Sequence, residues 1–310
     1  MSLPLSPATH EDRVGICREV LEGLATGDAL GEAGSYGYEN VRTWVTSRLP
    51  SIRALRYTDD TEMASAILEV LVRLKGIDED VLAWQFRRRF QRDPERGYGK
   101  MTRRFLEQTL AGEDWRTVVS RLSGGGSFGN GSAMRAAPVG AYFFDSPAKT
   151  VTMATASATV THGHSEGIAG AVAVALAACV AAGGREREPA GVAKAIFETA
   201  VRYVGNGRTA EGIRRAQKLP ADTPVAAAAS LLGNGAEITC MDTVPFCLWN
   251  ACRCLHDYQE AILSTIEAGG DCDTNAAIVG GIVAAWAGVR SIPADWLAAR
   301  EPLRIEGGNS

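Results

Sequence analysis

Several features that would place a chain in a specialised class are missing from this 310-residue sequence. No long run of Lys or Arg is present and the formal net charge is only -4, so we expect no general nucleic-acid binding and no attraction to acidic membranes. The N-terminus lacks the basic start and apolar run of a signal peptide. The longest apolar stretch, residues 168–182, is shorter than the roughly 20 residues that span a bilayer, so we interpret it as a buried helix.

Cysteine patterns typical of zinc clusters and disulfide scaffolds are also absent. The chain has seven cysteines, an odd number, and no CxxC motif. Most of them lie in apolar helical stretches, where cysteine usually acts as a small core residue. We therefore expect free thiols and a reducing, cytoplasmic environment.

Alternating apolar and polar runs are absent too, whereas helical spacing recurs along the chain. Val14, Cys17, Val20, Leu21 and Leu24 form one apolar stripe on a helix. The same spacing predicts further helices over residues 60–75, 79–92, 99–111, 113–122, 132–143, 148–161, 165–183, 188–204, 242–256, 258–268 and 273–288. Because no low-complexity linker or internal repeat divides the chain, we predict one compact all-α domain over residues 11–303, with flexible ends at 1–10 and 304–310. We expect a monomer, because nothing in the sequence demands a partner subunit.

Two segments concentrate oxygen ligands at the start of an apolar helix. They are Tyr57-Thr58-Asp59-Asp60-Thr61-Glu62-Met63-Ala64 and Gly269-Gly270-Asp271-Cys272-Asp273-Thr274-Asn275-Ala276. Helix capping explains one such segment, since Thr and Asp satisfy free N–H groups. Two segments together would bring four carboxylates into one place, where they repel unless a cation lies between them. Carboxylate and hydroxyl ligands without His or Cys favour Mg²⁺ or Mn²⁺. That the two segments meet in space is a hypothesis at this point.

A glycine-rich loop over residues 124–131 leads into the next helix and to Arg135. Backbone N–H groups at a helix start can hold phosphate oxygens, although no Gly-Lys-Ser/Thr sequence follows, so this is not a Walker loop. A structural turn is an equal alternative, and Arg135 is either a phosphate partner or the donor of an internal salt bridge. His162 and His164 have no third nitrogen or sulfur ligand nearby, so we expect them to hydrogen-bond a ligand or cap a helix rather than bind metal.

Taken together, these segments resemble the ADP-ribosylglycohydrolase family, which includes the dinitrogenase-reductase-activating glycohydrolase and the ADP-ribosylhydrolases. The matching segments are Gly27-Asp28-Ala29-Leu30-Gly31, Thr58-Asp59-Asp60-Thr61, Gly129-Asn130-Gly131-Ser132-Ala133-Met134-Arg135, Thr161-His162-Gly163-His164 and Gly270-Asp271-Cys272-Asp273-Thr274. They occur in the family's order and fall within residues 27–288. The resemblance implies a compact, single-domain, multi-helix fold with a central dinuclear metal cleft.

The resemblance also implies roles for individual residues. The expected ligands of two Mg²⁺ or Mn²⁺ ions are Thr58, Asp59 and Asp60 on one side, and Asp271, Asp273 and Thr274 on the other. Asp59 or Asp60 would act as the general base. The residues expected on the diphosphate and adenosine side are Gly126, Ser127, Phe128, Gly129, Asn130, Arg135 and His162. Those expected at the distal ribose are Gly97, Tyr98 and Gly99.

The chain departs from the family pattern at one position. Several relatives carry a Glu four residues after the Gly-Asp-x-x-Gly motif, and Ser35 stands there in this sequence. The nearest acid is Glu32, directly after Gly31. Either Glu32 takes over the catalytic role of that Glu, or the role is absent.

The resulting hypothesis is a metal-dependent hydrolase that cleaves the glycosidic bond between ADP-ribose and a protein side chain or another small acceptor. The principal alternative is a non-catalytic protein of the same fold that binds ADP-ribose or a related nucleotide. A dinuclear phosphatase is less favoured, because such sites often mix His with carboxylates. A structural role, as in the lens proteins related to this family, is less favoured because the expected metal ligands are all retained.

Overall fold

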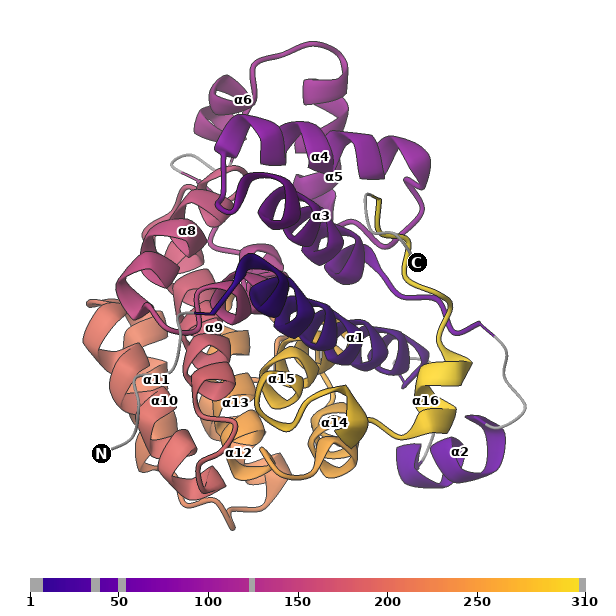
Figure 1. Ribbon diagram of the computed structural model, residues 1–310, viewed down its shortest axis with the longest axis vertical. Coiled ribbons are helices and arrows are strands. Elements are labelled where there is room, and N and C mark those ends of the chain that lie inside the picture. Colours follow the sequence, from indigo (N-terminus) through magenta and orange to yellow (C-terminus); the bar gives the residue numbers. More distant parts are fainter. Residues whose placement is uncertain (1–7, 35–39, 50–53, 123–125, 307–310) are drawn as a thin grey trace.

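A computed structural model describes residues 8–34, 40–49, 54–122 and 126–306 (Figure 1). Within these ranges the chain forms sixteen α-helices and no β-strand, so the all-α prediction is confirmed. The first six are α1 (His10–Gly34), α2 (Val41–Arg48), α3 (Asp59–Leu74), α4 (Glu79–Arg92), α5 (Lys100–Leu110) and α6 (Trp115–Arg121). The short 3₁₀ helix η3 (Asn130–Ser132) comes before α7 (Ala137–Tyr142), α8 (Pro147–Thr159), α9 (Ser165–Gly183), α10 (Pro189–Tyr203) and α11 (Arg208–Lys218). The chain ends with α12 (Val225–Leu232), α13 (Cys240–Arg253), α14 (Tyr258–Glu267), α15 (Cys272–Ala287), η4 (Val289–Ser291) and α16 (Ala294–Ala299).

The helices that apolar spacing did not predict are α2, α11, α12 and α16. They are short, and the buried face of α11 consists mostly of small residues, with Ile213 as its one large apolar side chain. Its apolar residues Ala210, Ile213 and Ala216 do recur at three-residue spacing, but the stripe covers only about two turns. The helix predicted over residues 132–143 is divided, because Pro138 in the first turn of α7 suits a helix start and not a helix interior.

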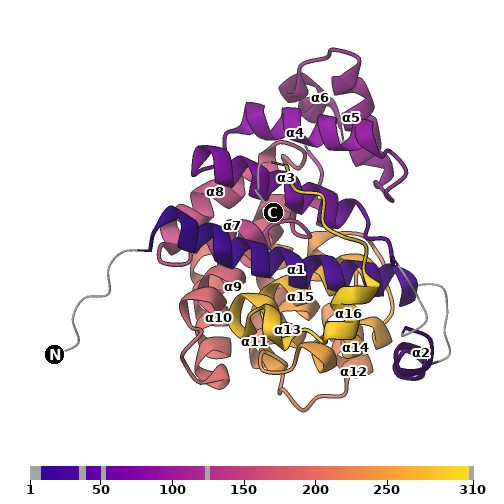
Figure 2. The ribbon, with the colours of Figure 1, turned by 45° about the vertical axis from the view of Figure 1, so that its right-hand side comes forward.

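Helices α1 and α15 form the closest helix pair of the fold, and they lie beside each other in Figures 1 and 2. Gly23, Gly27 and Gly31 follow at four-residue spacing along the face of α1 that meets α15. A Cβ atom at Gly27 would lie 2.1 Å from the carbonyl oxygen of Ala276, and one at Gly31 would lie 2.6 Å from the Cα of Asp273. The missing side chains therefore let the two backbones approach each other.

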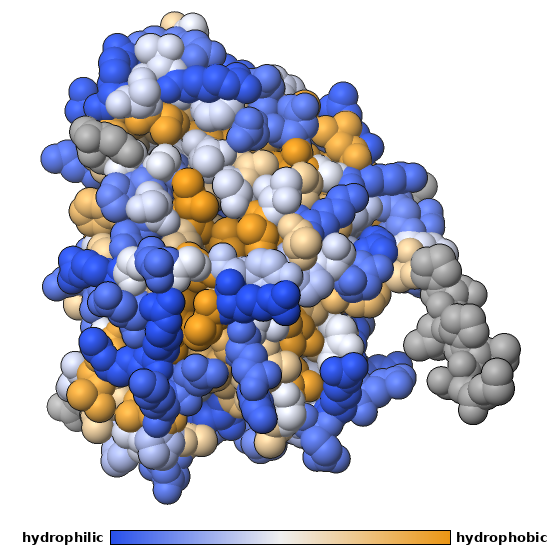
Figure 3. Space-filling view, turned by 90° about the vertical axis from the view of Figure 1, so that its left-hand side faces the viewer, coloured by the Kyte–Doolittle hydropathy of each residue, from blue (hydrophilic) through white to orange (hydrophobic). Residues whose placement is uncertain are grey.

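The apolar helix α9 is long and apolar enough to cross a membrane by composition alone, but 72% of its apolar window is buried within the protein. It packs against α7, α8, α10, α13 and α15, as expected for a buried helix. All seven cysteines are free, and six of them are buried. On the face that Figure 3 shows, hydrophilic residues predominate and hydrophobic residues form small groups between them.

Described residues near both ends of the chain take part in the helical fold. Helix α1 already begins at His10. The segment after α16 runs back toward α3 (Figure 1), where the backbone N–H of Glu306 donates to Glu69 and the carbonyl of Arg304 accepts from Arg89. Residues 304 and 306 thus contact α4 and α3. Residues 1–7 and 307–310 lie outside the described part of the chain.

The α1–α15 contact can be tested with Gly27→Ala. The added Cβ would collide with backbone, so we expect a loss of about 1–3 kcal/mol in the free energy of unfolding, measured by urea titration. Gly15→Ala on the same helix is the matched control, because its Cβ would meet nothing within 4 Å. This control should gain up to about 1 kcal/mol from helix propensity. Equal midpoints for Gly27→Ala and the unaltered protein would contradict the close packing.

Candidate functional site

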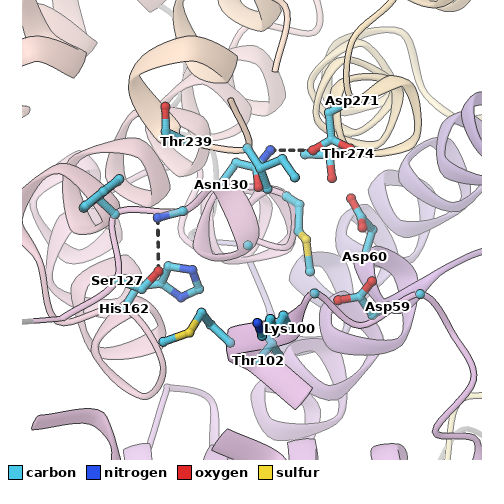
Figure 4. Close-up of a pocket in the computed structure, with 18 of the residues that line it drawn as sticks. Asp59, Asp60, Lys100, Thr102, Ser127, Asn130, His162, Thr239, Asp271 and Thr274 are labelled. Carbon is cyan, nitrogen blue, oxygen red and sulfur yellow. Dashed lines mark hydrogen bonds between the residues drawn. The ribbon is translucent and has the colours of Figure 1, made fainter. Parts of the chain in front are cut away.

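Several helices begin around one pocket of about 390 Å³. Its wall includes the first residues of α3, α5, η3 and α15, together with the loop before α13 (Figure 4). The lining residues are Asp59, Asp60, Gly97, Gly99, Lys100, Met101, Thr102, Ser127, Phe128, Gly129, Asn130, Gly131, Met134, His162, Glu237, Ile238, Thr239, Asp271, Asp273 and Thr274. The two acidic segments, far apart in the sequence, therefore meet at one site.

The start of α3 is fixed by a buried carboxylate from α1. Asp28 accepts hydrogen bonds from the backbone N–H of Thr58 (3.0 Å) and from the backbone N–H of Thr61 (3.1 Å). The hydroxyl of Thr61 donates to the same carboxylate. Thr58 caps the helix, since its hydroxyl oxygen accepts from the backbone N–H of Asp60. The sequence motif around Asp28 indicated its importance, but not that its partners would be the acidic turn of α3.

The start of α15 is fixed from the opposite wall. The side-chain amide of Asn130 donates to Asp271 (2.6 Å) and to the hydroxyl of Thr243 (3.0 Å) (Figure 4). Gly270 has a φ of 75°, and a Cβ there would lie 2.0 Å from the carbonyl oxygen of Asn234. That carbonyl in turn accepts from the backbone N–H of Asp271 (3.2 Å). The glycine thus permits the tight turn that brings Asp271 to the pocket.

The carboxylates around this pocket destabilise one another's charges. Burial, and then repulsion from Asp28, raises the pKa of Asp59 to about 8. Burial and the same neighbour raise the pKa of Asp60 well above its usual value, and burial with repulsion from Asp271 does so for Asp273. One carboxylate oxygen of Asp60, Oδ1, is buried without a hydrogen-bond partner. A bound cation would relieve both the repulsion and the missing partner.

The donor set of the pocket suits a hard cation in its chemistry. Asp59, Asp60, Asp271, Asp273 and Thr274 offer only oxygen atoms, which Mg²⁺ and Mn²⁺ prefer. Among the described residues, no three His, Cys, Asp or Glu side chains are placed to hold a metal ion as they stand. Binding would therefore require these side chains to move closer together, while the amide of Asn130 could go on orienting Asp271.

Residues 127–131 of the predicted glycine-rich loop form another wall of the pocket, whereas residues 124 and 125 lie outside the described residues. The backbone N–H of Gly129 donates to the hydroxyl of Ser127 (3.1 Å), the second hydrogen bond drawn in Figure 4. Gly131 lies close to His162, because a Cβ there would be 3.1 Å from the imidazole Cε1. Gly126 (φ 104°) does not line the pocket but allows the loop to pass close to residues 163 and 164. The other histidine, His164, caps α9 by accepting a hydrogen bond from the backbone N–H of Glu166, which is the capping alternative predicted from the sequence.

Arg135 does not reach the pocket and is fully buried. Its guanidinium donates to the carbonyl oxygens of Gly131 (3.1 Å) and Ser157 (3.0 Å) and to the hydroxyl of Thr161 (2.8 Å). It also lies over the ring of Phe86. The expected phosphate contact is therefore corrected to an internal role, in which Arg135 supports the loop and the turn before His162.

The loop Gly97-Tyr98-Gly99 contributes its glycines to the pocket, but its tyrosine turns inward. The Tyr98 ring packs edge-on against Phe90, with 5.0 Å between ring centroids, and its side chain is buried. Gly97 has a φ of 84°, and a Cβ there would lie 3.7 Å from a carboxylate oxygen of Asp59. If this loop contacts substrate as predicted, the contact would be made by the backbone of Gly97 and Gly99 and not by the side chain of Tyr98.

Glu32 and Thr58 line a neighbouring recess of about 400 Å³, not the pocket of the aspartates. The two cavities share Gly97 in their linings. The predicted catalytic position of Glu32 is therefore displaced from Asp59 and Asp60 by the wall that Gly97 helps to form. Ser35 lies outside the described residues.

Sequence reasoning did not identify the first turn of α5 or the loop before α13 as parts of the pocket. Lys100 and Thr102 come from the former, and Glu237 and Ile238 from the latter. Ile238 is 62% exposed and has a φ of 54°, which is rare for a β-branched residue. The glycines that precede each segment in the sequence were the available signal, but glycine clusters also mark ordinary turns.

Comparisons with known proteins indicate the family of the chain. The family model described as ADP-ribosylglycohydrolase matches residues 6–307. ADP-ribosylhydrolase ARH3 of Homo sapiens is 28% identical over 271 residues, which cover 78% of this chain and 74% of that protein. An uncharacterized protein of Archaeoglobus fulgidus is 31% identical over 293 residues and 90% of both chains.

A comparison with solved structures supports the fold independently of the sequence comparisons. The protein described as an ADP-ribosylglycohydrolase-related protein complex superposes with a TM-score of 0.58 at 21% identity, over 94% of this chain and 93% of that chain. Because the family model spans nearly the whole sequence and the fold agrees, the chain belongs to the ADP-ribosylglycohydrolase family.

Proposed function

We propose that this chain is a cytoplasmic, monomeric hydrolase that uses two Mg²⁺ or Mn²⁺ ions to cleave the glycosidic bond between ADP-ribose and an acceptor. The acceptor is a protein side chain or the acceptor part of a small ADP-ribosyl conjugate. The observation that carries the proposal is the meeting of the acids from α3 and α15 in one pocket with a glycine-rich loop. The names of the relatives, ADP-ribosylhydrolases, supply the substrate class.

Asp59, Asp60, Asp271, Asp273 and Thr274 would hold the two ions, and Thr58 would join them from its capping position. When bound, the ions would orient the hydroxyls of the distal ribose and lower the pKa of the attacking water. Asp59 or Asp60 would take the proton of that water as general base, while the water oxygen bonds to the anomeric carbon and the bond to the acceptor breaks. The acceptor would leave with the bonding electron pair and take up a proton. The remaining carboxylate charge stabilises the positive charge that develops at the anomeric carbon in an oxocarbenium-like transition state.

The rest of the pocket binds and orients the substrate. Its volume of about 390 Å³ lies within the range of small-molecule sites. The backbone of the loop from Ser127 to Asn130 holds the diphosphate and adenosine part, and Gly97 and Gly99 flank the distal ribose. Met101, Phe128 and Ile238 all border the pocket and are among the exposed large hydrophobic side chains of the described chain, so they offer apolar surface to a nucleobase.

His162 contributes a neutral ring to this wall. Burial and then the nearby Arg135 lower the pKa of His162 to about 3. Its Nδ1 shares a hydrogen bond with the hydroxyl of Thr161 (2.7 Å). The ring therefore hydrogen-bonds as a neutral group across the physiological pH range and is not a proton donor of the reaction.

One observation favours the alternative of a non-catalytic ADP-ribose-binding protein. Glu32 lies in the neighbouring recess, and Ser35 stands where several relatives carry a Glu. A chain that lacks an acid at this point would bind ADP-ribose without cleaving its conjugates.

The ligand assignment predicts the effect of removing single carboxylates. Asp59→Asn, Asp60→Asn, Asp271→Asn and Asp273→Asn should each weaken Mn²⁺ binding by about tenfold or more, since losing even a partner of a ligand costs that much. Calorimetric titration with Mn²⁺ measures the affinity, and turnover should fall in parallel. The exposed Asp222→Asn is the matched control. Unchanged Mn²⁺ affinity in all four variants would refute the assignment.

The reaction itself can be tested with arginine-linked, serine-linked, nucleobase-linked and polymeric ADP-ribose. We expect ADP-ribose to be released from at least one of these substrates, EDTA to stop the release, and Mg²⁺ or Mn²⁺ to restore it. Chromatography of free ADP-ribose is the measurement. Tight binding of ADP-ribose without release from any substrate would establish the binding-protein alternative.

The depressed pKa of His162 predicts a pH dependence of stability. The unfolded chain takes up a proton on His162 below about pH 6.5, whereas the folded chain does not until about pH 3. The free energy of unfolding should therefore fall on acidification below 6.5, by up to about 1.4 kcal/mol per pH unit from this residue. The buried aspartates with raised pKa values act in the opposite direction, so the test is the difference in unfolding free energy between the unaltered protein and His162→Gln, measured by urea titration at several pH values. On acidification below 6.5 the unaltered protein should lose stability relative to His162→Gln, whereas it should keep a constant difference from the exposed-site control His256→Gln. A difference from His162→Gln that does not change with pH would contradict the buried neutral ring.

A further inference from the structure

The residue directly before the acidic turn of α3 is held at both ends of its backbone. The N–H of Tyr57 donates to Glu301 (3.1 Å), and its carbonyl oxygen accepts from Arg96 (2.8 Å). The guanidinium of Arg96 also lies over the Tyr57 ring, 4.4 Å from the centroid. The chain that leads to Asp59 and Asp60 is therefore fixed by two side chains from distant segments.

Arg96 also joins this point to the Gly97 loop, which lies against Thr58 and Asp59. Its Nε donates to Asp93 (2.8 Å), and both of its terminal nitrogens donate to the carboxylate of Glu301. Its side chain is 1% exposed. The next residue is Gly97, which lines the pocket beside Asp59. One buried guanidinium thus connects the acidic turn, the Gly97 loop and the segment after α16.

The segment that carries Glu301 is fixed against the same stretch of chain. The backbone N–H of Leu55 donates to the carbonyl of Ala299 (2.7 Å), and the N–H of Glu301 donates to the carbonyl of Leu55 (3.0 Å). Arg300 forms an ion pair with Glu22 of α1. Glu301 therefore approaches Tyr57 from a support that is anchored independently of the ion pair with Arg96.

A buried ion pair of this kind adds little net stability, because desolvation offsets most of the attraction between the charges. What it does provide is direction, since the planar guanidinium and the carboxylate bond in fixed geometry. Here that geometry is applied to the backbone just before the acidic turn and just before Gly97, which are neighbours in the pocket wall.

We propose that Arg96 and Glu301 are positioning residues: together they hold the Thr58–Asp60 turn and the Gly97 loop at the separation that the site requires. The inference rests on the proposed function, because the site that they serve is the proposed metal and ribose site. Neither residue lines the pocket of the aspartates, and both act through Tyr57 and Gly97.

The decisive variants are Glu301→Gln and Arg96→Lys, with Glu306→Gln as the matched control. Glu306 lies in the same segment but forms exposed ion pairs with Arg88 and Arg92. We expect Glu301→Gln to raise the Kd for Mn²⁺ by about tenfold or more, as for other residues that orient ligands. Hydrogen exchange of the amides of residues 57–61 should quicken, while Glu306→Gln leaves both readings unchanged. Arg96→Lys keeps the positive charge but lacks the planar guanidinium with its several donors. It should therefore raise the Kd for Mn²⁺ and quicken the exchange in the same way. This variant tests the positioning role if Glu301→Gln does not fold.

The apolar double variant Arg96→Met/Glu301→Leu separates positioning from stability. It removes both charges, so its thermal midpoint should be close to that of the unaltered protein. Its affinity for Mn²⁺ should nevertheless stay low. The positioning role would be overturned if folded Arg96→Lys or Glu301→Gln kept the Mn²⁺ affinity and amide exchange of the unaltered protein. It would also be overturned if the double variant bound Mn²⁺ as tightly as the unaltered protein. Failure of the unaltered protein itself to bind Mn²⁺ would instead sink the proposed function, and the exchange rates of residues 57–61 would still decide the positioning role.

Discussion

The contact between α1 and α15 is the constraint on which the site depends. Glycines at four-residue spacing let the two backbones approach until Gly31 lies against Cys272 and Asp273. One helix turn earlier on α1, Asp28 binds the backbone of Thr58 and Thr61. A single helix therefore sets the position of α3 and of α15, and the two acidic turns meet because each is placed against α1.

The pocket also collects several helix starts, and this has an electrostatic consequence. The N-terminal end of a helix carries partial positive charge and free N–H groups, which favour carboxylates and phosphates. At α3 and α15 these ends help to tolerate the buried aspartates, although they do not compensate for them. Burial, and after it the repulsion between the carboxylates, still raises their pKa values, which suits a site that gains its final charge balance from a ligand.

The parts of this molecule that could be predicted from sequence are those that local chemistry determines. Asp59, Asp60, Asp271 and Asp273 stand at the start of apolar helices, and the glycine-rich loop stands at a turn, so their places follow from spacing. The direction of a side chain relative to a pocket wall does not follow from spacing. Arg135 and Tyr98, for example, are buried away from the pocket, and Glu32 lines the neighbouring recess that shares Gly97 with it. Each of these three residues is nevertheless part of, or next to, a sequence motif of the site. Short helices such as α11 have few apolar residues at helical spacing, which is weak evidence on its own.

The pairing of α1 with α15 also constrains how the chain reaches its native state. The contact joins residues about 240 to 260 positions apart, from Gly31 with Cys272 to Gly23 with Ala284, and it fills most of the glycine face of α1. During synthesis this face must wait until α15 has emerged, with its small residues open to water and to other chains. Local helices can form early, but the long stretch of chain between α1 and α15 must bring its two ends together before either acidic turn is supported. An unfinished or truncated chain would thus resemble a collapsed helical intermediate without a site, the kind of species that chaperones retain.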